Sequence, residues 1–543
     1  MRADGAGAQE KRRRVAMLPV AELPQPHATN PHPGNLATGN SATRIRVEYA
    51  SPMSATLITR YPDVRNYIGG TFVDASDRDY LDVTNPSDGS VISRVPLSGA
   101  REVDAAVDAA RKAFPIWSSM PIKERAQVFY RYKALLERDL DSLANLVSEE
   151  NGKIKSEAAA EVLKSAELCE FACSLPQIVP GEVLEVSRGV ECRVERYPVG
   201  IVASIAPFNF PNMVPNWTLP NALALGNCMI LKPSEQVPLS AAKIAELLKE
   251  AGLPDGVLNI VHGGIDTVEA ICDSPFIEAV SFVGSTHVAK IVYRRATANL
   301  KRALALGGAK NHLIVMPDAD PEMTSSNVVA SMSGCAGQRC MAASVMMAVG
   351  GTDHIIERMS NIVRGMVPGV HIGPVISKAA KDRIERYITE AEEAGAKVLV
   401  DGRGYTVSGK ENGFYVGPTL LDQVTPDMRI AQEEIFGPVM TIIRSKDVDE
   451  ALAVQHRSPY GNAASVFTES GGVARYVMEN ASAGMVGVNV GVPVPREPFG
   501  FGGWNESKFG TGDITGRGSI EFWTKAKKMT TKWNKEAGVN WMS

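Results

Sequence analysis

The sequence predicts an α/β fold in which parallel sheets are covered by helices on both faces. Between residues 200 and 300, short apolar runs alternate with stretches whose apolar residues recur at helical spacing, and a second alternation follows from about residue 311. Strands buried on both faces are continuously apolar, and helices connect neighbouring parallel strands. The chain has 543 residues, of which 44% are hydrophobic, so it is long enough for two or three domains and a large core.

The first 58 residues differ from the rest of the chain. They contain the basic run KRRR and a segment rich in Pro, Asn and His, without apolar periodicity. This composition predicts a disordered tail, or an over-extended start with Met53 as the true beginning. A transit peptide would place the protein in the mitochondrial matrix, but Asp4, Glu10 and Glu22 oppose it because such peptides avoid acidic residues. We therefore expect a cytoplasmic protein.

Two helical patterns, over 100–117 and 123–152, precede the first alternating region. The expected strands and helices then follow as GIVASIAP, PNWTLPNALALG, NCMILKPS, PLSAAKIAELLKEAG, GVLNIVHGG, EAVSFVGS and HVAKIVYRRATANL. Ligands bind parallel sheets beyond the carboxyl ends of the strands. The residues to inspect are therefore those that end these runs, namely Asn209, Lys232, Gly263 and Gly284.

The second alternating region contains the apolar runs HLIVM, SVMMAVG, AKVLVDG and PVMTIIR. Near the C-terminus, GSIEFWTKAKKMTTKW alternates apolar and polar residues at its start and predicts a late strand.

Charge and cysteine content exclude several classes of protein. The net charge of −4 provides no basic surface for nucleic acid, and no apolar run approaches the roughly 18 residues that span a bilayer. The seven cysteines are scattered, and no pair of C-x-x-C units has zinc-site spacing. This pattern indicates free thiols without a metal site, and Cys169 and Cys173 are expected to be buried on one helix.

Six short motifs occur in a fixed order: APFNFPN (206–212), LKPSE (231–235), FVGST (282–286), GQRC (337–340), EEIFGPV (433–439) and GVNVG (487–491). Each motif alone is a weak signal. Together, at these separations, they make the chain resemble the NAD(P)-dependent aldehyde dehydrogenase superfamily from roughly residue 60 to the end. GQRCMA, LGGAKNH and NVGVPVP are most similar to the coenzyme A-acylating methylmalonate-semialdehyde dehydrogenase branch.

This resemblance implies an aldehyde dehydrogenase-like fold with a Rossmann-type cofactor domain, an α/β catalytic domain and a small oligomerisation sheet. The expected NAD-binding domain comprises residues 59–179 and 199–309, and the catalytic domain comprises 310–505. Segments 180–198 and 506–543 are expected to form the oligomerisation sheet. Strands offered at a chain end need a partner edge, so a homodimer or homotetramer is expected.

The resemblance identifies Cys340 as the catalytic nucleophile and leaves Cys335 as a core residue. A cysteine thiolate attacks the aldehyde carbon, and after hydride transfer to the nicotinamide a thioester remains. A free thiol has a pKa of roughly 8.5, so the protein must favour the thiolate. Because CMAASVMM is a good helix former, we expect Cys340 at a helix start, where the dipole stabilises an anion.

Asn209 matches the family's oxyanion partner, acting with the backbone N–H of Cys340. Losing one such donor typically raises the barrier by about 3 kcal/mol. The alternative interpretation of Asn209 is an Asx-turn between two prolines.

The other motifs match cofactor contacts of the family. Lys232 and Glu235 match the adenosine ribose contacts, and a carboxylate there repels a 2′-phosphate, which favours NAD. Gly284 and Ser285 match the pyrophosphate side, although Ala289 stands where the family usually has a glycine. Three further matches, on the nicotinamide side of the site, are Phe208, Glu434 and Phe436. Taken separately, KPSE and GST are more typical of a helix entry and a turn.

One departure from the hydrolytic members concerns the base that activates water. They read Glu-Leu-Gly-Gly where this chain reads Ala305-Leu306-Gly307-Gly308. Such a base typically contributes about 10²- to 10⁴-fold to the rate. Its absence favours release of the acyl group to the thiol of coenzyme A, with loss of carbon dioxide from a 3-oxo acid.

The expected substrate is a short semialdehyde, malonate or methylmalonate semialdehyde, because the branch binds a substrate carboxylate with two arginines. Arg339 matches one arginine. Lys164 stands at the other position and keeps the charge without the bidentate fork, and Arg496 is another source of a second cation. A solvated helix face remains the alternative for Lys164.

Two other functions stay open. A hydrolytic aldehyde dehydrogenase would release the free acid, with Glu434 as its base. A non-catalytic structural or binding relative belongs to a different class, and the presence of Cys340, Asn209 and Glu434 argues against it.

Overall fold

The computed structural model describes residues 59–76, 79–179 and 181–532. The interpretations of residues 1–58 as a tail, an over-extended start or a transit peptide lie outside these described residues and stay predictions.

An eight-stranded sheet with strand order β2-β1-β9-β8-β7-β10-β11-β21 dominates the first half of the chain. Its five central strands, β9, β8, β7, β10 and β11, pair in parallel. Strands β1 and β2 at one edge and β21 at the other edge pair antiparallel. Its strands are β1 (Asn66–Ile68), β2 (Thr71–Val73), β7 (Ile201–Ile205), β8 (Cys228–Lys232), β9 (Leu258–Ile260), β10 (Ile277–Val283), β11 (Arg302–Leu306) and β21 (Lys508–Phe509). The predicted parallel sheet of the first region is therefore confirmed.

Helices enclose this sheet because its central strands carry apolar side chains on both faces. Helices α5 and α6 contact the sheet and are in turn contacted by α2, while α1 contacts the sheet and α7. The helices are α1 (Ala100–Ser119), α2 (Ile122–Arg138), α3 (Leu140–Asn151), α4 (Lys155–Ile178), α5 (Met213–Ala224), α6 (Leu239–Glu250), α7 (Ile265–Asp273) and α8 (Thr286–Ala298). Helix α3 ends at Gly152, whose positive φ of 90° is the left-handed C-terminal conformation that glycine adopts without strain.

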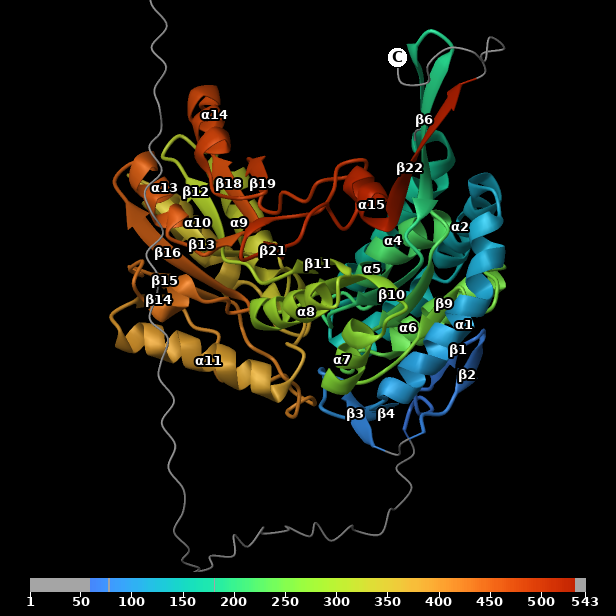
Figure 1. Ribbon diagram of the computed structural model, residues 1–543. Helices are drawn as coiled ribbons and strands as arrows, with labels where there is room; N and C mark the ends of the chain where they lie inside the picture. The colour runs from blue at the N-terminus through green and yellow to red at the C-terminus, as the bar shows by residue number, and fades with distance from the viewer. Residues whose placement is uncertain (1–58, 77–78, 180, 533–543) are drawn as a thin grey trace, which may run out of the picture. The chain divides into compact units, whose positions relative to one another are not determined.

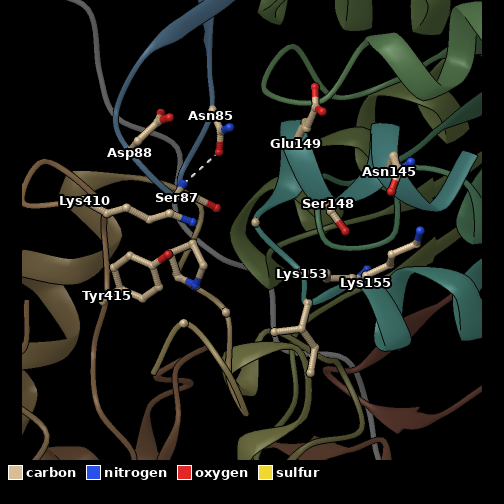
Figure 2. Close-up of a pocket in the computed structure, with 15 residues that line it drawn as sticks. Asn85, Ser87, Asp88, Asn145, Ser148, Glu149, Lys153, Lys155, Lys410 and Tyr415 are labelled. Carbon is tan, nitrogen blue, oxygen red and sulfur yellow. Dashed lines mark hydrogen bonds between the residues drawn. The ribbon is translucent and has the colours of Figure 1, made fainter. Parts of the chain in front are cut away.

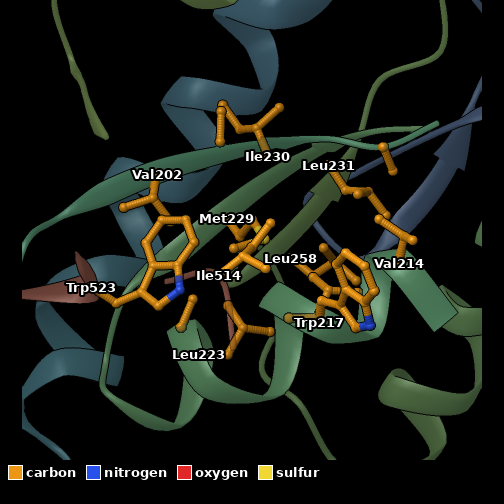
Figure 3. Packing of buried hydrophobic residues seen from close by; sticks show 14 of the residues in the cluster. Val202, Val214, Trp217, Leu223, Met229, Ile230, Leu231, Leu258, Ile514 and Trp523 are labelled. Atoms are coloured by element: carbon orange, nitrogen blue, oxygen red, sulfur yellow. The ribbon is translucent and has the colours of Figure 1, made fainter. Parts of the chain in front are cut away.

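The core of this region packs aromatic side chains against the sheet. Trp217 of α5 and Trp523 lie beside the strands, with Leu223 between them (Figure 3). The backbone carbonyl of Trp523 accepts hydrogen bonds from Asn227 Nδ2 at 3.0 Å and from Val199 N at 3.2 Å. These contacts attach a segment near the C-terminus to the first sheet.

A seven-stranded sheet with order β14-β15-β16-β13-β12-β18-β19 forms the second region, and all its pairs are parallel except β14 with β15. Its strands are β12 (Asn311–Val315), β13 (Ala343–Val349), β14 (Lys397–Val400), β15 (Thr419–Asp422), β16 (Val439–Ser445), β18 (Ala463–Phe467) and β19 (Met485–Val488). Its helices are α9 (Pro321–Ser333), a 3₁₀ turn (Gly334–Gly337), α10 (Asp353–Arg364), α11 (Lys378–Glu393), α12 (Arg429–Gln432), α13 (Val448–His456) and α14 (Gly471–Asn480). The second alternation therefore also corresponds to a mainly parallel sheet.

A three-stranded antiparallel sheet joins β5 (Glu182–Ser187), β6 (Val190–Pro198) and β22 (Thr524–Lys532). Figure 1 shows β6 and β22 running side by side. The remaining strands pair as β3 (Tyr80–Thr84) with β4 (Val91–Pro96) and β17 (Tyr460–Gly461) with β20 (Trp504–Asn505).

Two expectations about the C-terminal part were wrong. The start of GSIEFWTKAKKMTTKW is helix α15 (Gly516–Trp523), and the strand begins only at Thr524. Helix α15 buries Ile520, Phe522 and Trp523 against the core, so tertiary packing decides its conformation. In addition, β21 belongs to the eight-stranded sheet, although it lies in a segment assigned from sequence to the oligomerisation sheet.

None of the helices in the described ranges combines the length and the apolar character required of a transmembrane segment.

Candidate active site

Cys340 lines a cavity of about 690 Å³. Side chains of α4, of the segment after β7, of the 335–341 segment and of the 490–501 segment form its walls. Cys340 is half-buried, and the buried Cys335 lines the same cavity. All seven cysteines are free, and Cys169 and Cys173 are buried on α4 as predicted.

The expectation that Cys340 begins a helix was wrong. Cys340 lies in a turn, and the residues after it form strand β13. Alanine and methionine favour helices, but β13 is fully enclosed between β12 and β16, and sheet pairing overrides the local propensity. Helix α9 ends before the turn, so Cys340 is not itself at the N-terminus of a helix.

Side-chain hydrogen bonds hold the Cys340 turn instead. The carbonyl of Cys340 accepts hydrogen bonds from Asn311 Nδ2 and Asn462 Nδ2, both at 2.8 Å. A Cβ on Gly337 would lie 2.1 Å from the carbonyl oxygen of Gly437, so only glycine permits this close approach between the GQRC and EEIFGPV motifs. The backbone around the sulfur is therefore fixed from two sides.

Burial raises the pKa of Cys340 to about 12, and the negative charge of Glu434 acts in the same direction. Burial also raises the pKa of Cys335, to about 11. Both thiols are therefore protonated at neutral pH in this structure. The surroundings of Cys340 in this structure therefore favour the thiol over the thiolate.

Asn209 lies beside the Cys340 turn. Its Nδ2 donates a hydrogen bond of 2.9 Å to the carbonyl of Gln338, two residues before Cys340. An amide nitrogen carries two hydrogens, so one N–H of the buried Asn209 remains for an oxyanion. The Gln338 side chain in turn accepts from Ile376 N at 3.0 Å. The structure thus brings Asn209 and Cys340 together, although they lie 131 positions apart in sequence.

A buried ion pair holds the Asn209 segment from behind. Lys153 pairs with Glu161, and their side chains are 2% and 0% exposed. Lys153 Nζ also donates to the carbonyl of Asn209 at 2.6 Å, and Glu161 Oε1 accepts from Asn212 N at 2.8 Å and Met213 N at 3.0 Å. The pair therefore fixes both ends of this loop.

On its other side Lys153 borders a second, polar cavity of about 300 Å³ (Figure 2). Figure 2 shows Lys410 and Tyr415 on one wall and Ser148 and Lys155 on the opposite wall. Cys340 does not line this cavity.

Lys232 and Glu235 lie together at the carboxyl end of β8, where Lys232 Nζ donates to Glu235 Oε2 at 2.9 Å. Burial acts to raise the pKa of Glu235, but the Lys232 ammonium outweighs it and the pKa is lowered. Glu235 is therefore ionised at neutral pH. Gly284 and Ser285 lie between β10 and α8. The N–H of Gly284 donates to the carbonyl of Leu306 at 3.1 Å, so the N–H groups left for an anion at this helix start are those that follow Gly284. Ala289 is fully buried in α8.

Phe208, Glu434 and Phe436 form a group near the Cys340 turn. The rings of Phe208 and Phe436 meet edge to face, with centroids 5.8 Å apart. Phe436 has a φ of +55°, a strained conformation for a bulky residue that is frequent at functional sites. Glu434 accepts from Ala309 N at 3.0 Å, and burial raises its pKa to about 7.

The position at which the hydrolytic members carry their glutamate base lies in β11. Ala305 and Leu306 are buried in this strand and carry no carboxylate. A Cβ on Gly308 would lie 2.3 Å from Glu434 Oε2, so Glu434 occupies the space beside the segment that follows this strand.

The three cations of the candidate substrate site differ in their partners. Arg339 Nη2 donates to the carbonyls of Ala330 and Ser331, whereas its buried Nε has no partner among the described residues. Lys164 lines the cavity and pairs with carboxylates, so it is not on a simply solvated helix face. Arg496 also lines the cavity; its side chain is 80% exposed, and its Nη1 lies 3.7 Å from Glu167 Oε2.

Sequence reasoning missed the supporting acids of α4. Glu157 Oε1 accepts from Cys335 N at 2.7 Å, so Glu157 and Glu161, one helical turn apart, hold the two loops of the site. Glu161 falls among the buried positions Ala158, Val162 and Ser165. A charged residue within an apolar stripe signals a buried partner, and this pattern was available from the sequence.

The chain is similar to known proteins over most of its length. The aldehyde dehydrogenase family model matches residues 72–529. The chain is 44% identical to malonate-semialdehyde dehydrogenase 2 of Geobacillus kaustophilus over 485 residues, covering 88% of this chain and 100% of that protein. It is 45% identical over 484 residues to malonate-semialdehyde dehydrogenase 2 of Geobacillus thermodenitrificans, with 88% and 100% coverage.

Two solved structures are also similar. Methylmalonate-semialdehyde dehydrogenase from Oceanimonas doudoroffii matches with a TM-score of 0.86 and 42% identity, covering 87% of this chain and 99% of that chain. A Sinorhizobium meliloti protein assigned to the methylmalonate-semialdehyde dehydrogenases and crystallised with NAD matches with a TM-score of 0.87 and 40% identity, covering 88% and 99%. The predicted fold class is confirmed, and the chain belongs to the aldehyde dehydrogenase family.

Proposed function

We propose that this protein is an NAD-dependent dehydrogenase that oxidises malonate or methylmalonate semialdehyde to an acyl-coenzyme A, with loss of carbon dioxide. The observation that carries the proposal is the Cys340 turn with Asn209 beside it and no carboxylate at Ala305 or Leu306. The names of the relatives at 44% and 45% identity support the same substrates.

Cys340 and Asn209 carry the covalent steps of this reaction. The sulfur of Cys340 attacks the aldehyde carbon and forms a thiohemiacetal, whose oxyanion the free N–H of Asn209 and the backbone N–H of Cys340 stabilise. The C–H electron pair then leaves as hydride, the C–O double bond re-forms, and a thioester remains on Cys340. The C–C bond to the β-carboxylate breaks with release of carbon dioxide, its electron pair forms the enolate of the thioester, and a proton from water completes the α-carbon. The coenzyme A thiolate attacks the thioester and displaces the Cys340 thiolate.

The residues beyond the strand ends fit NAD. The ionised Glu235, paired with Lys232, suits ribose hydroxyls and disfavours a 2′-phosphate. The start of α8, after Gly284, offers the N–H groups of its first turn to a pyrophosphate. Glu434 and the Phe208–Phe436 pair lie on the Cys340 side, as the nicotinamide end requires. Bound NAD supplies the hydride acceptor.

The decisive experiment is NADH formation from malonate and methylmalonate semialdehydes, with and without coenzyme A. We expect turnover to require coenzyme A and to yield an acyl-coenzyme A, because Ala305 stands where the hydrolytic members have the glutamate that activates water. Coenzyme A-independent turnover to the free acid would contradict the proposal. It would favour the hydrolytic alternative, in which Glu434, with its pKa of about 7 and its place beside Gly308, serves as the base.

The alternative of a non-catalytic relative is tested by thiol labelling. A catalytic Cys340 is expected to react faster than the six other cysteines once NAD is bound. Uniform labelling of all seven would favour the non-catalytic role.

We also infer the division of the chain from its sheets. Residues 59–179 and 199–309 supply the eight-stranded sheet and form the NAD-binding domain, except that β21 is contributed from the segment after residue 505. Residues 310–505 supply the seven-stranded sheet and form the catalytic domain. Segments 180–198 and 506–543 complete the chain.

We propose that the three-stranded sheet joins copies of this chain into a homodimer or homotetramer. All residues of the edge strand β5 are exposed, including Val183, Leu184 and Val186. An open strand edge with apolar side chains needs a partner. A light-scattering mass of two or four chains is expected, and the mass of one chain would contradict it.

A further inference from the structure

The cavity of Cys340 does not offer an excess of positive charge to an anionic substrate. Besides its two cysteines, its ionisable lining residues are three cations (Lys164, Arg339 and Arg496) and four carboxylates (Glu157, Glu161, Glu167 and Glu497). Lys153 neutralises Glu161 from outside the cavity. A substrate carboxylate gains most from a cation without a competing carboxylate, so the partners of each cation decide the selectivity.

Lys164 already has two carboxylate partners. Its Nζ lies 3.0 Å from Glu497 Oε2 and 3.0 Å from Glu167 Oε2. Glu497 is the more buried partner, with 13% of its side chain exposed against 46% for Glu167. Because screening by water is weaker at Glu497, this carboxylate holds the Lys164 charge more strongly.

Arg339 is different, because its hydrogen-bond partners are neutral. Its Nη2 donates to the carbonyls of Ala330 and Ser331, and its buried Nε lacks a partner among the described residues. A Cβ on Gly334 would lie 2.1 Å from this Nη2, so the guanidinium rests directly on a glycine next to the cavity. Arg339 therefore forms no ion pair among the described residues, although its charge also acts on Glu157, whereas Lys164 pairs with two carboxylates.

We propose that Glu497 is a specificity-determining residue that competes with the substrate carboxylate for the ammonium of Lys164. The carboxylate of a semialdehyde is then attracted by Arg339 without displacing an ion-pair partner. It binds the ammonium of Lys164 only after it displaces Glu497. The cavity walls also include the apolar side chains of Phe210, Met213 and Trp217, which suit an uncharged aldehyde. The wild-type protein therefore discriminates only modestly between short semialdehydes and uncharged aldehydes. This inference relies on the proposed function for the identity of the cavity as the aldehyde site.

The test is protection of Cys340 from iodoacetamide by 3-hydroxypropanoate, which has the carboxylate of malonate semialdehyde but no carbonyl to react. Labelling of Cys340 is followed by mass spectrometry at pH 8.5, with propan-1-ol as the uncharged analogue. The measured quantity is the ratio of two half-protecting concentrations, that of 3-hydroxypropanoate divided by that of propan-1-ol. We expect this ratio to be about tenfold lower in Glu497→Gln and in Glu497→Ala than in the wild type. An unchanged ratio in both variants would overturn the proposal.

Two further variants separate competition for Lys164 from a general change of charge. Adding Lys164→Gln to Glu497→Gln is expected to return the ratio to the wild-type value. Glu137→Gln removes a carboxylate from an exposed Lys133 pair outside the cavity and is expected to leave the ratio unchanged. A gain that survives Lys164→Gln, or that Glu137→Gln reproduces, would contradict the assigned role of Glu497.

The protection assay needs neither NAD nor coenzyme A, so it distinguishes this inference from the proposed function. Coenzyme A-independent turnover would refute the proposed function, but the expected shift in the protection of Cys340 would not depend on that result. Normal coenzyme A-dependent turnover with no shift in protection would refute the role of Glu497 alone. As a kinetic check, the ratio of kcat/KM for malonate semialdehyde to that for propanal is expected to rise in Glu497→Gln by the same factor, through KM.

Discussion

Two Lys–Glu pairs lie along helix α4 and the turn before it, and they differ in their surroundings. Lys153 and Glu161 are 2% and 0% exposed, whereas Lys164 and Glu497 are 21% and 13% exposed. The buried pair also bonds backbone groups of the Asn209 loop. The pair at the cavity mouth has only another side chain, Glu167, as its additional partner.

This difference teaches how one helix serves two purposes. A buried pair whose spare atoms bond backbone is fixed, because removing one partner leaves an uncompensated charge in a medium of low dielectric. A partly exposed pair is replaceable, because water or another carboxylate compensates the remaining charge. The first pair therefore positions Asn209, and the second is open to competition from a ligand.

Glu161→Gln should have the largest effect on stability, because it leaves the Lys153 ammonium buried without a counter-charge. We expect the free energy of unfolding to fall by about 3–5 kcal/mol, measured by denaturant unfolding. Replacing both residues, as Lys153→Met with Glu161→Leu, should recover much of this loss because no charge then remains buried. A loss below about 1 kcal/mol in Glu161→Gln would show that the two pairs do not differ.

Asn209→Ala tests the catalytic role of Asn209, the residue that the buried Lys153–Glu161 pair positions. Removing the oxyanion donor should lower kcat by about 10²- to 10³-fold, or roughly 3 kcal/mol of barrier. The free energy of unfolding should change by only about 1 kcal/mol, because one hydrogen bond to the Gln338 carbonyl is lost. A kcat within tenfold of the wild type would remove Asn209 from the mechanism.

The sequence alone predicts much of the scaffold. Apolar runs such as Cys228–Lys232 correspond to strands because parallel strands are buried on both faces. Lys232 and Gly284 were found from chain order, since a strand end and a helix start are local events in the sequence.

The remaining features depend on tertiary contacts. The residues after Cys340 have helical propensity but lie between two strands that come from distant parts of the chain. The partner of Lys164 is Glu497, 333 positions away, and no local pattern connects them. Glu161 is the intermediate case, because a charge in an apolar stripe predicts that a partner exists without identifying Lys153.

Glu434→Gln extends the comparison to Glu434, a buried carboxylate that belongs to neither Lys–Glu pair. Its pKa of about 7 means that Glu434 is neutral below pH 6 and ionised above pH 8, where its charge raises the pKa of Cys340. Removing this charge should lower the thiol pKa, so iodoacetamide should label Cys340 several-fold faster at pH 8.5 and at the wild-type rate at pH 6. The control is Glu433→Gln, because Glu433 is exposed and pairs with Arg429. Equal rates for Glu434→Gln and the wild type at both pH values would show that Glu434 does not act on the thiol.

Glu497→Gln should have the smallest effect on stability, and this small effect is what the selectivity proposal requires. Lys164 keeps Glu167 as a partner and reaches water, so the free energy of unfolding should fall by less than about 1 kcal/mol. The measurement is the same denaturant unfolding as for Glu161→Gln, so that the two pairs are compared directly. A loss of 3–5 kcal/mol would place the Lys164–Glu497 pair in the same class as the buried one. A substrate carboxylate would not displace a partner held so strongly, because the exchange would cost more than one charge-assisted hydrogen bond returns.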